Sequence, residues 1–471
     1  MSGVVDCLVV GSGPGSAVTA FHLVQAGRGV VMLEEGRDAR PAPPRAYSQK
    51  EIIQSYRSAG ISPALGRQRI NYAEGSCLGG GSEVNSGLYH RVPGDVLEVW
   101  RRDFQVAELG DGALDEHHSW IEEEVGVSYL EGPASKASQR LDAGARALGW
   151  ASQEVPRFQT YRSGETYAGG LKNSMSRTLL PRFVELGGDL RCPARVERLR
   201  RIGRTWSVRV RTAGGTEELR AHHVFMGAGA VSTPFLLRRS GIRRHIGDSL
   251  RLHPMLKVVA RFGEVVNEPG MGVGVHQVRE FSPQQSFGCS ISSLPFLGIG
   301  LIDYPDELGA LRADWPYLAQ YYAQVCGDSY GTVRALPFVG SPLVRYHLSD
   351  HDAHAMAVSL GRLARLLLEA GATAIYPNLR QQGPLCSEAD IAALPDRLLA
   401  HRTELVAVHL VGSCPMGENT KRCAADSFGR VWGPDELFLV DGSALCTAPS
   451  VNPQGTIMAV ARRNVLRFLE S

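Results

Sequence analysis

Residues 4–16 read VVDCLVVGSGPGS, an apolar, valine-rich run that ends in a glycine-rich turn. Such a run is typical of a buried strand in a parallel sheet. Gly11 and Gly13 fall where this strand passes into a helix, and there the backbone can approach a pyrophosphate and donate helix N-terminal N–H groups to it. The stretch therefore predicts an α/β protein with a doubly wound parallel sheet that binds a dinucleotide.

The next residues extend this unit. Residues 17–26 have helical apolar spacing and end at Gly27, and a second strand over residues 29–33 leads to Glu34. An acidic side chain about 20 residues after the turn is placed to meet a ribose hydroxyl, and it disfavours the 2′-phosphate of NADP. FAD or NAD is therefore favoured. Ser16 departs from the pattern, because Gly or Ala normally stands there to allow close packing of the helix.

Bulk properties exclude several classes of function. The chain has 471 residues, with 50 Lys and Arg against 48 Asp and Glu, and a formal charge of +2. It lacks the basic footprint of a nucleic-acid binder. Its nine cysteines form no CxxC pair, which favours a reducing compartment over a disulfide framework. No apolar run reaches the ~18 residues of a membrane span, and the first residues show no signal peptide, so we expect a cytoplasmic protein without a membrane span.

Further blocks rich in glycine or small polar residues follow along the chain. Residues 74–91, EGSCLGGGSEVNSGLYHR, contain several glycines that would let backbone pass against a flat or extended ligand. The other blocks are HHVFMGAGAVSTPFLLRRSGI (222–242), IGDSLRLHP (246–254), VHLVGSCPMG (408–417) and LFLVDGSALCTAPSVNPQGTIMAVARRNVLRFL (437–469). None of these blocks is specific by itself, but their order along the chain is.

Taken together, the blocks resemble the glucose–methanol–choline family of FAD-dependent oxidoreductases, including its cholesterol-oxidase-like branch. The resemblance implies an FAD-binding domain with a doubly wound parallel sheet and a substrate domain with an antiparallel sheet and helices. We expect residues 1–95, 189–255 and 405–471 to form the FAD-binding domain. Residues 96–188 and 256–404 are then expected to form the substrate-binding domain.

The resemblance also implies a set of cofactor-binding residues: Gly11, Gly13, Ser16, Glu34, Gly79, Gly80, Ser82, Asn85, Val196, Asp441, Gly442, Asn452 and Pro453. In this set the first two glycines face the FAD pyrophosphate, Glu34 the adenosine ribose, and the backbone of Val196 the adenine. The loop over 79–85 follows the flavin. Residues 441–442 lie near the ribityl chain and pyrophosphate, and residues 452–453 at the edge of the isoalloxazine.

The resemblance predicts that FAD is held without a covalent bond. Family members that attach FAD covalently carry a histidine just before the loop asparagine, and Val84 occupies that position here. Reduced flavin would pass its electrons to O₂ or another acceptor. Two other interpretations stay open at this point: an NAD-dependent reductase that uses only the N-terminal fingerprint, and a flavin-binding protein without catalysis.

His409 and Asn452 match the catalytic pair of the family. Oxidation of an alcohol removes the hydroxyl proton while the α-hydrogen leaves as hydride to flavin N5, so a base must lie within hydrogen-bond reach of the oxygen. A histidine can act as this base near neutral pH, and a neutral asparagine can donate an N–H that orients the oxygen. An Asn before a Pro also predicts that Asn452 is the N-cap and Pro453 the first residue of a helix to about Phe468.

Two groups of histidines are not predicted to form a functional site. Histidines within 347–356, HLSDHDAHAM, have metal-like spacing, but Ser349 and Asp352 resemble a capping box that opens a long helix. No metal site is therefore predicted. His117 and His118 adjoin acidic residues and are expected on a solvated helix face.

The substrate prediction rests on residues 291–330. This segment contains one base, Arg312, and five acids: Asp303, Asp306, Glu307, Asp314 and Asp328. Aromatic residues are interleaved with the acids, so the segment could bind a polyhydroxylated cation. The chain is also similar in size to family members that oxidise a hydroxymethyl group of aminoglycoside precursors. An aminosugar of aminoglycoside biosynthesis is therefore the expected substrate, with a neutral sugar or another small alcohol as the alternative.

Overall fold

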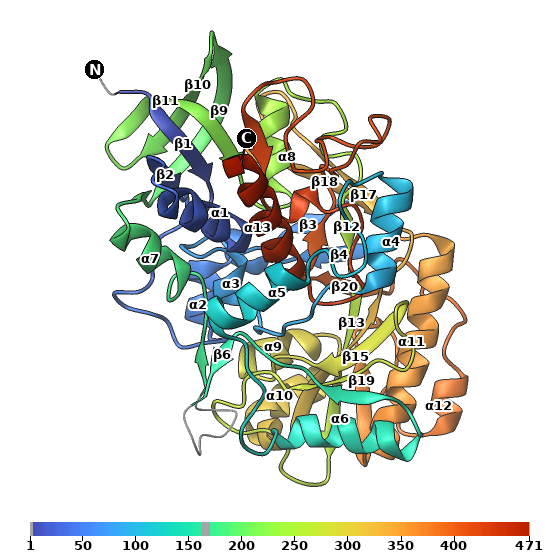
Figure 1. Cartoon of the computed structure of the whole chain (residues 1–471). Coiled ribbons are helices and arrows are strands. Elements are labelled where there is room, and N and C mark those ends of the chain that lie inside the picture. Colours follow the sequence, from blue (N-terminus) through green and yellow to red (C-terminus); the bar gives the residue numbers. More distant parts are fainter. Residues whose placement is uncertain (1–2, 162–169, 471) are drawn as a thin grey trace.

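The computed structural model describes residues 3–161 and 170–470, which form two sheets with helices around them (Figure 1). The strands of the first sheet are, in order, β8 (Asp189–Arg191), β2 (Val30–Leu33), β1 (Val5–Val10), β11 (Gly215–Met226), β10 (Thr205–Thr212) and β9 (Ala194–Ile202), with β22 (Leu437–Leu439) paired to β11. Strands β8, β2, β1, β11 and β22 are parallel to their neighbours, and β9 to β11 form an antiparallel extension. The predicted α/β fold with a parallel sheet is confirmed.

The helices of the first sheet gather around its N-terminal unit. Helix α1 (Pro14–Gln25) packs beside α13 (Gln454–Glu470) and α7 (Leu179–Glu185), and α13 also contacts α5 (Asp115–Ile121) (Figure 1). Helix α1 begins three residues before the predicted start, because Pro14 is compatible with the first turn of a helix, where its missing N–H is not needed.

The second sheet is mainly antiparallel. Its strands are, in order, β3 (Pro63–Ala64), β4 (Arg69–Tyr72), β20 (Glu404–Ala407), β13 (Met255–Phe262), β16 (Leu318–Val325), β15 (Gln285–Cys289), β14 (His276–Val278) and β5 (Ser152–Glu154), with β19 (Ala372–Pro377) also paired to β13. Helices α11 (Asp350–Glu369) and α6 (Lys136–Ala147) pack against this sheet, as the orange and teal helices of Figure 1 show. On the opposite face, α9 (Leu294–Gly300) packs on β13 and β16, and other residues of these two strands line a cavity.

The remaining helices are short. They are α2 (Gln49–Ser55), α3 (Gly81–Val84), α4 (Gly94–Asp103), α8 (Ser232–Arg239), α9 (Leu294–Gly300), α10 (Pro305–Asp314) and α12 (Glu388–Ala392). The small strand pairs outside the two sheets are β6 (Gln159–Thr160) with β7 (Leu171–Lys172), β12 (Arg251–Leu252) with β21 (Leu410–Val411), and β17 (Tyr330–Arg334) with β18 (Leu343–His347).

The two sheets correspond only in part to the two domains that the sequence predicts. Every strand of the first sheet lies in the segments 1–95, 189–255 and 405–471. Strands β3 and β4 also lie in 1–95, but they pair with the second sheet. Helices α5 and α7, within 96–188, pack against helices of the first sheet. The exact domain boundaries therefore stay a prediction.

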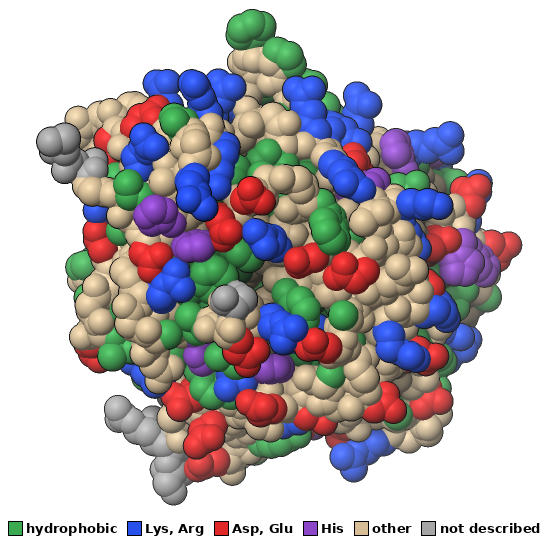
Figure 2. All heavy atoms as spheres, turned by 45° about the horizontal axis from the view of Figure 1, so that its top comes forward, with side chains coloured by type: hydrophobic (Ala, Val, Ile, Leu, Met, Phe, Trp, Pro, Cys, Tyr) green, Lys and Arg blue, Asp and Glu red, His purple; other side chains and the backbone are tan. Residues whose placement is uncertain are grey.

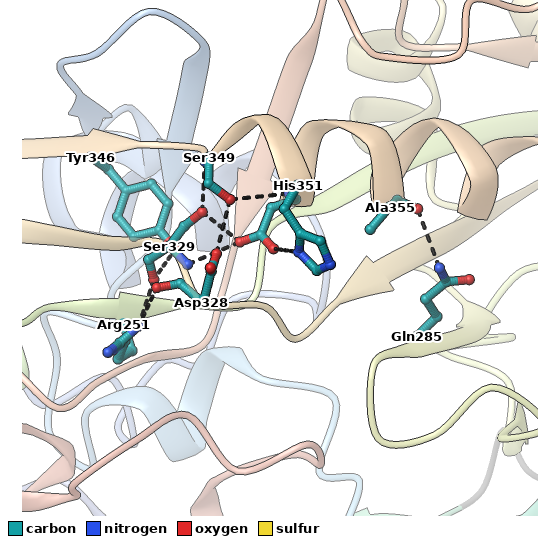
Figure 3. A network of polar contacts seen from close by, with 9 residues as sticks. Arg251, Gln285, Asp328, Ser329, Tyr346, Ser349, His351 and Ala355 are labelled. Atoms are coloured by element: carbon teal, nitrogen blue, oxygen red, sulfur yellow. Dashed lines mark hydrogen bonds and ion pairs between the residues drawn. The ribbon is translucent and has the colours of Figure 1, made fainter.

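The start of α11 follows the predicted capping pattern (Figure 3). The hydroxyl of Ser349 accepts a hydrogen bond from the backbone N–H of Asp352 at 3.1 Å. The buried carboxylate of Asp352 accepts bonds from the N–H and hydroxyl of Ser329. Ligand atoms of Asp328, His351 and Asp352 lie within 4.8 Å of one another, a spacing that could hold a metal ion. The hydrogen bonds to Ser329 explain the cluster as an anchor for the helix.

The prediction for His118 was wrong. Its side chain is buried, and its Nδ1 lies 2.9 Å from the hydroxyl of Tyr89. Burial lowers the pKa of His118 to about 4. His118 faces residues 89–92 instead of water, and its Nε2 accepts a hydrogen bond from the backbone N–H of Val92 at 3.3 Å.

The surface carries acidic and basic side chains close together on the face shown in Figure 2. This mixture agrees with the nearly balanced composition. No helix within residues 3–161 and 170–470 combines the length and apolar character that a membrane crossing needs.

Candidate active site

One cavity of about 1010 Å³ connects the two sheets. The glycine-rich loops of the first sheet line one part of it, and strands β13 and β16 of the second sheet line another. The predicted residues that line it are Gly11, Gly13, Glu34, Gly80, Asn85, Val196, His409, Asp441, Gly442, Asn452 and Pro453. Blocks that are distant in sequence therefore meet around a single space that is large enough for a cofactor and a small ligand.

The N-terminus of α1 is built to receive an anion. Gly13 is the N-cap and provides no side chain to cap the helix, so N–H groups of the first turn have no side-chain acceptor. A Cβ added to Gly13 would meet no protein atom within 4 Å, whereas one added to Gly11 would lie 2.3 Å from the carbonyl oxygen of Gly227. Gly13 thus leaves room for a ligand, and Gly11, with φ of +92°, lets the loop pass β11.

Ser12 joins the loop to two other elements of the site. Its backbone N–H and its hydroxyl both donate to the carboxylate of Glu34, at 2.9 and 2.6 Å. The same hydroxyl accepts a hydrogen bond from the N–H of Gly79 at 2.9 Å. The N–H of Gly36 donates to the other carboxylate oxygen. Glu34 therefore orders both glycine-rich loops through Ser12, a residue that the sequence analysis did not single out.

Three predicted cofactor residues, Ser16, Gly79 and Ser82, are not among the residues that line the cavity and lie behind them. The hydroxyl of Ser16 lies 3.4 Å from the carbonyl oxygen of Gly227, so this side chain holds α1 close to the end of β11. The hydroxyl of Ser82 donates to the carbonyl of Gly79 and accepts from the N–H of Met175. These residues shape the loops from behind, and position along the sequence could not distinguish this role from contact with the cofactor.

Asp441 also has a structural role. Its buried carboxylate accepts hydrogen bonds from the hydroxyl of Thr233 at 2.6 Å, from the N–H of Gly229 at 2.8 Å and from the N–H of Ser443 at 2.8 Å. These bonds connect the turn after β22 with the turn after β11. The carboxylate fixes the shape of the cavity wall, and the neighbouring Gly442 forms part of that wall.

His409 and Asn452 meet in the cavity. The Nε2 atom of His409 lies 3.3 Å from the Nδ2 atom of Asn452. The predicted helix start is one residue off, because α13 begins at Gln454 and the carbonyl of Pro453 accepts the first helical hydrogen bond, from Ile457. Pro453 is therefore the N-cap, and the Asn452 side chain points across the cavity to His409 instead of capping the helix.

Gln277 and His253 fix the orientation of this pair. The side-chain N–H of Gln277 donates to Oδ1 of Asn452 at 3.3 Å and to the hydroxyl of Tyr322 at 2.7 Å. The Nδ2 group of Asn452 is thereby directed to Nε2 of His409, which accepts. The Nδ1 atoms of His409 and His253 are 3.0 Å apart, so the proton on Nδ1 of His409 is donated to His253. This tautomer leaves Nε2 of His409 available as a base.

Burial keeps His409 neutral. Burial lowers the pKa of His409 well below its ordinary value, and the nearby ammonium group of Lys257 lowers it further. An unprotonated imidazole can take a proton from an alcohol, whereas an imidazolium cannot. No motif in the sequence pointed to Gln277. His253 stands in the block 246–254, but no feature of that block indicated contact with His409.

We expect replacement of His253 by Phe to slow the reduction of the flavin by up to about 10²-fold, because His409 loses the partner that sets its tautomer and orientation. Bound cofactor should stay unchanged. His253→Gln, which retains a hydrogen-bond acceptor, should restore part of the rate. Rapid-mixing absorbance under anaerobic conditions measures both variants, and equal rates for the Phe variant and the unmodified protein would exclude this positioning role.

Fold and site together define a flavin-dependent oxidoreductase: a doubly wound sheet with an anion-binding helix terminus, joined to a cavity where a neutral histidine and an asparagine converge. Models of the GMC oxidoreductase family match residues 51–255 and 329–461. The chain belongs to this family, and its cofactor is FAD. The open N-terminus of α1 and the empty space beside Gly13 fit the FAD pyrophosphate.

Similar proteins cover nearly the whole chain. A GMC-type oxidoreductase of Sinorhizobium fredii is 35% identical over 97% of this chain and 93% of its own length. A 2-methyl-1,2-propanediol dehydrogenase of Mycolicibacterium austroafricanum is 25% identical over 97% and 94%. A long-chain-alcohol oxidase of Arabidopsis thaliana is 27% identical over 97% of this chain and 66% of its own. The crystal structure of pyridoxine 4-oxidase from Mesorbium loti superposes with a TM-score of 0.75 at 18% identity, over 99% of both chains.

Proposed function

We propose that this protein oxidises the hydroxyl group of a small alcohol to an aldehyde or ketone, with His409 as the base and Asn452 as the group that orients the oxygen. The 3.3 Å approach of His409 Nε2 to Asn452 Nδ2 inside the FAD cavity carries this proposal. The names of the relatives support it, since they include an alcohol oxidase and a diol dehydrogenase. Val84, in place of a histidine, favours FAD held without a covalent bond.

The two side chains divide the work on the hydroxyl group. An oxygen between them can donate its proton to Nε2 of His409 and accept an N–H from Nδ2 of Asn452. His409 then becomes charged, and its Nδ1–H remains bonded to His253. FAD, when bound, supplies the acceptor for the hydride that leaves the alcohol carbon. The electrons then pass to O₂ or another acceptor, a choice that the relatives' names leave open, because they include both an oxidase and a dehydrogenase.

The expected aminosugar substrate loses its main support. None of the five acids of 291–330 is among the residues that line the cavity, and Asp314 is paired with Arg261. The acids that do line it, such as Glu34 and Asp441, lie at the dinucleotide end. An aminosugar thus remains a prediction without a visible cation site, and the proposed substrate is an alcohol of a wider class.

An anaerobic absorbance titration tests the proposed function. The holoprotein is mixed with a panel of alcohols: an aminosugar, a neutral sugar, benzyl alcohol and a straight-chain alcohol. Bleaching of the oxidised flavin band by one of them supports alcohol oxidation and identifies the substrate class. A band that survives every alcohol, in protein that dithionite still reduces, contradicts the proposal.

The lowered pKa of His409 predicts an unusual pH dependence. Because this pKa lies well below 6.5, the base is already unprotonated near pH 7, and its activity should be lost only when the pH falls through the lowered value. We expect the rate of flavin reduction to stay constant between about pH 6.5 and 7.5 and to decrease at lower pH. Rapid-mixing kinetics at a series of pH values measure the rate of flavin reduction. A rate that falls to half its maximum near pH 6.5 would indicate a histidine with an ordinary pKa and would contradict this prediction.

A further inference from the structure

The second sheet presents a polar face to the cavity. Alternate residues of a strand point to opposite faces. On β16, Gln320, Tyr322 and Gln324 line the cavity, while their neighbours pack into the core beneath helix α11. On β13, Met255 and Lys257 line it, and Lys257 is paired with Tyr322 in the register of the sheet. A cation therefore stands in the middle of a wall that otherwise offers neutral groups.

Lys257 has little to balance its charge. Its ammonium group donates a hydrogen bond of 2.5 Å to the hydroxyl of Ser290, and no carboxylate of the described residues lies within 4.0 Å of it. An ammonium group has three donors, so one neutral partner leaves it largely unsatisfied. Burial lowers the pKa of Lys257 to about 8, so the protonated form still predominates at pH 7. A half-buried cation with one neutral partner favours a ligand that brings a negative charge.

Lys257 also acts electrostatically on His409. Its charge contributes to the lowered pKa of His409, and both residues line the same cavity. Phe296 and Ile299, on α9, add an apolar part to this end of the wall. A ligand with its hydroxyl at His409 would therefore place its body near apolar side chains and within reach of the ammonium group.

We propose that Lys257 binds an anionic group of the substrate, so that this enzyme prefers acidic alcohols: a hydroxyl group on an apolar or aromatic body that also carries a carboxylate or phenolate. The proposal rests on the proposed alcohol oxidation at His409 and narrows its substrate class. It predicts the opposite charge preference to that of an aminosugar oxidase.

Binding of ligands that cannot be oxidised tests Lys257 apart from catalysis. Benzoate, phenylacetate and 3-phenylpropionate are each titrated into the holoprotein beside their neutral amides, with the change in flavin absorbance giving Kd. The best carboxylate should bind about 10- to 100-fold more tightly than its amide, as expected for a charge-assisted hydrogen bond. In Lys257→Met this ratio should fall to about 1, and in Lys257→Arg most of it should remain. Lys421→Met, which removes an exposed lysine, should keep the original ratio.

Two binding results would overturn the proposal. One is a ratio near 1 in the unmodified protein, and the other is a ratio that Lys257→Met leaves unchanged, including the case in which it weakens acid and amide equally. Equal weakening would mean that Lys257 shapes the cavity or faces the flavin. Absence of any spectral change with all three carboxylates would also overturn it.

A set of benzyl alcohols that differ in charge separates the proposed role of Lys257 from the proposed alcohol oxidation. Benzyl alcohol, 4-(hydroxymethyl)benzoate and 4-(aminomethyl)benzyl alcohol carry neutral, negative and positive groups. Faster bleaching of the flavin by the carboxylate supports binding of the anionic group by Lys257. Equal bleaching by all three alcohols rejects that role of Lys257 but leaves the proposed alcohol oxidation intact. If none of them or of the wider panel bleaches the flavin, alcohol oxidation fails, and the ratio of binding constants still decides the role of Lys257.

Discussion

His409→Ala is expected to slow the reduction of the flavin by an alcohol by about 10² to 10⁴-fold while FAD stays bound. The Nε2 atom of the imidazole lies 3.3 Å from Nδ2 of Asn452, where the proposed mechanism places the substrate oxygen. In that mechanism, the variant lacks the group that accepts the hydroxyl proton. Single-turnover absorbance under anaerobic conditions measures the rate directly.

Two controls isolate this effect. His401→Ala removes an exposed histidine and should leave the rate unchanged. Asn452→Ala should lower the rate less than His409→Ala, since it removes a hydrogen bond to the oxygen but leaves the base in place. A flavin reduction rate that is the same with and without His409 would remove this residue from the mechanism.

Gly13→Val is expected to weaken FAD binding by roughly 10²-fold or more without unfolding the protein. A Cβ at this position projects into open cavity, where the pyrophosphate must approach the N-terminus of α1, and the φ of −65° suits any residue. The side chain therefore competes with the cofactor and not with the protein. Fluorescence titration of the apoprotein with FAD measures the affinity, and circular dichroism checks the fold.

Neighbouring glycines provide the contrast. Gly11→Val should prevent folding, because its Cβ would lie 2.3 Å from a backbone oxygen at a φ of +92°. Gly309 is exposed on α10, and a Cβ added there also meets no protein atom within 4 Å. The Gly309→Val variant should therefore bind FAD normally. If Gly13→Val bound FAD as tightly as Gly309→Val, the pyrophosphate would not lie at the N-terminus of α1.

Local patterns predicted the parts of the site that depend on neighbouring residues. The valine-rich run before Gly11 specifies a buried strand, and the glycines after it specify the turn and the start of α1. The positions of His409 and Asn452 followed from the order of the motifs. The exact cap of α13 did not, since a Pro satisfies either the N-cap or the first helical position, and only the contact of Asn452 with His409 decides between them.

Long-range contacts could not be predicted. Gln277 reaches Asn452 across 175 residues, and His253 reaches His409 across 156. Both are common polar residues in strand-like surroundings, where a sequence shows no partner. The acids of 291–330 misled the substrate prediction for the same reason: charge counted along a segment does not say which side chains turn toward the cavity and which toward solvent or an arginine such as Arg261.

The sequence by itself determined the family and the cofactor, and it predicted His409 and Asn452 as the catalytic pair, because each depends on short motifs whose backbone conformation is set locally by glycines, prolines and β-branched residues. The tertiary structure alone decided which groups contact His409 and which strand face carries Lys257 into the cavity. Pairing of β12 with β21 brings His253 beside His409. Which face of β13 meets the cavity is fixed by the pairing of strands and by the helices that cover the other face.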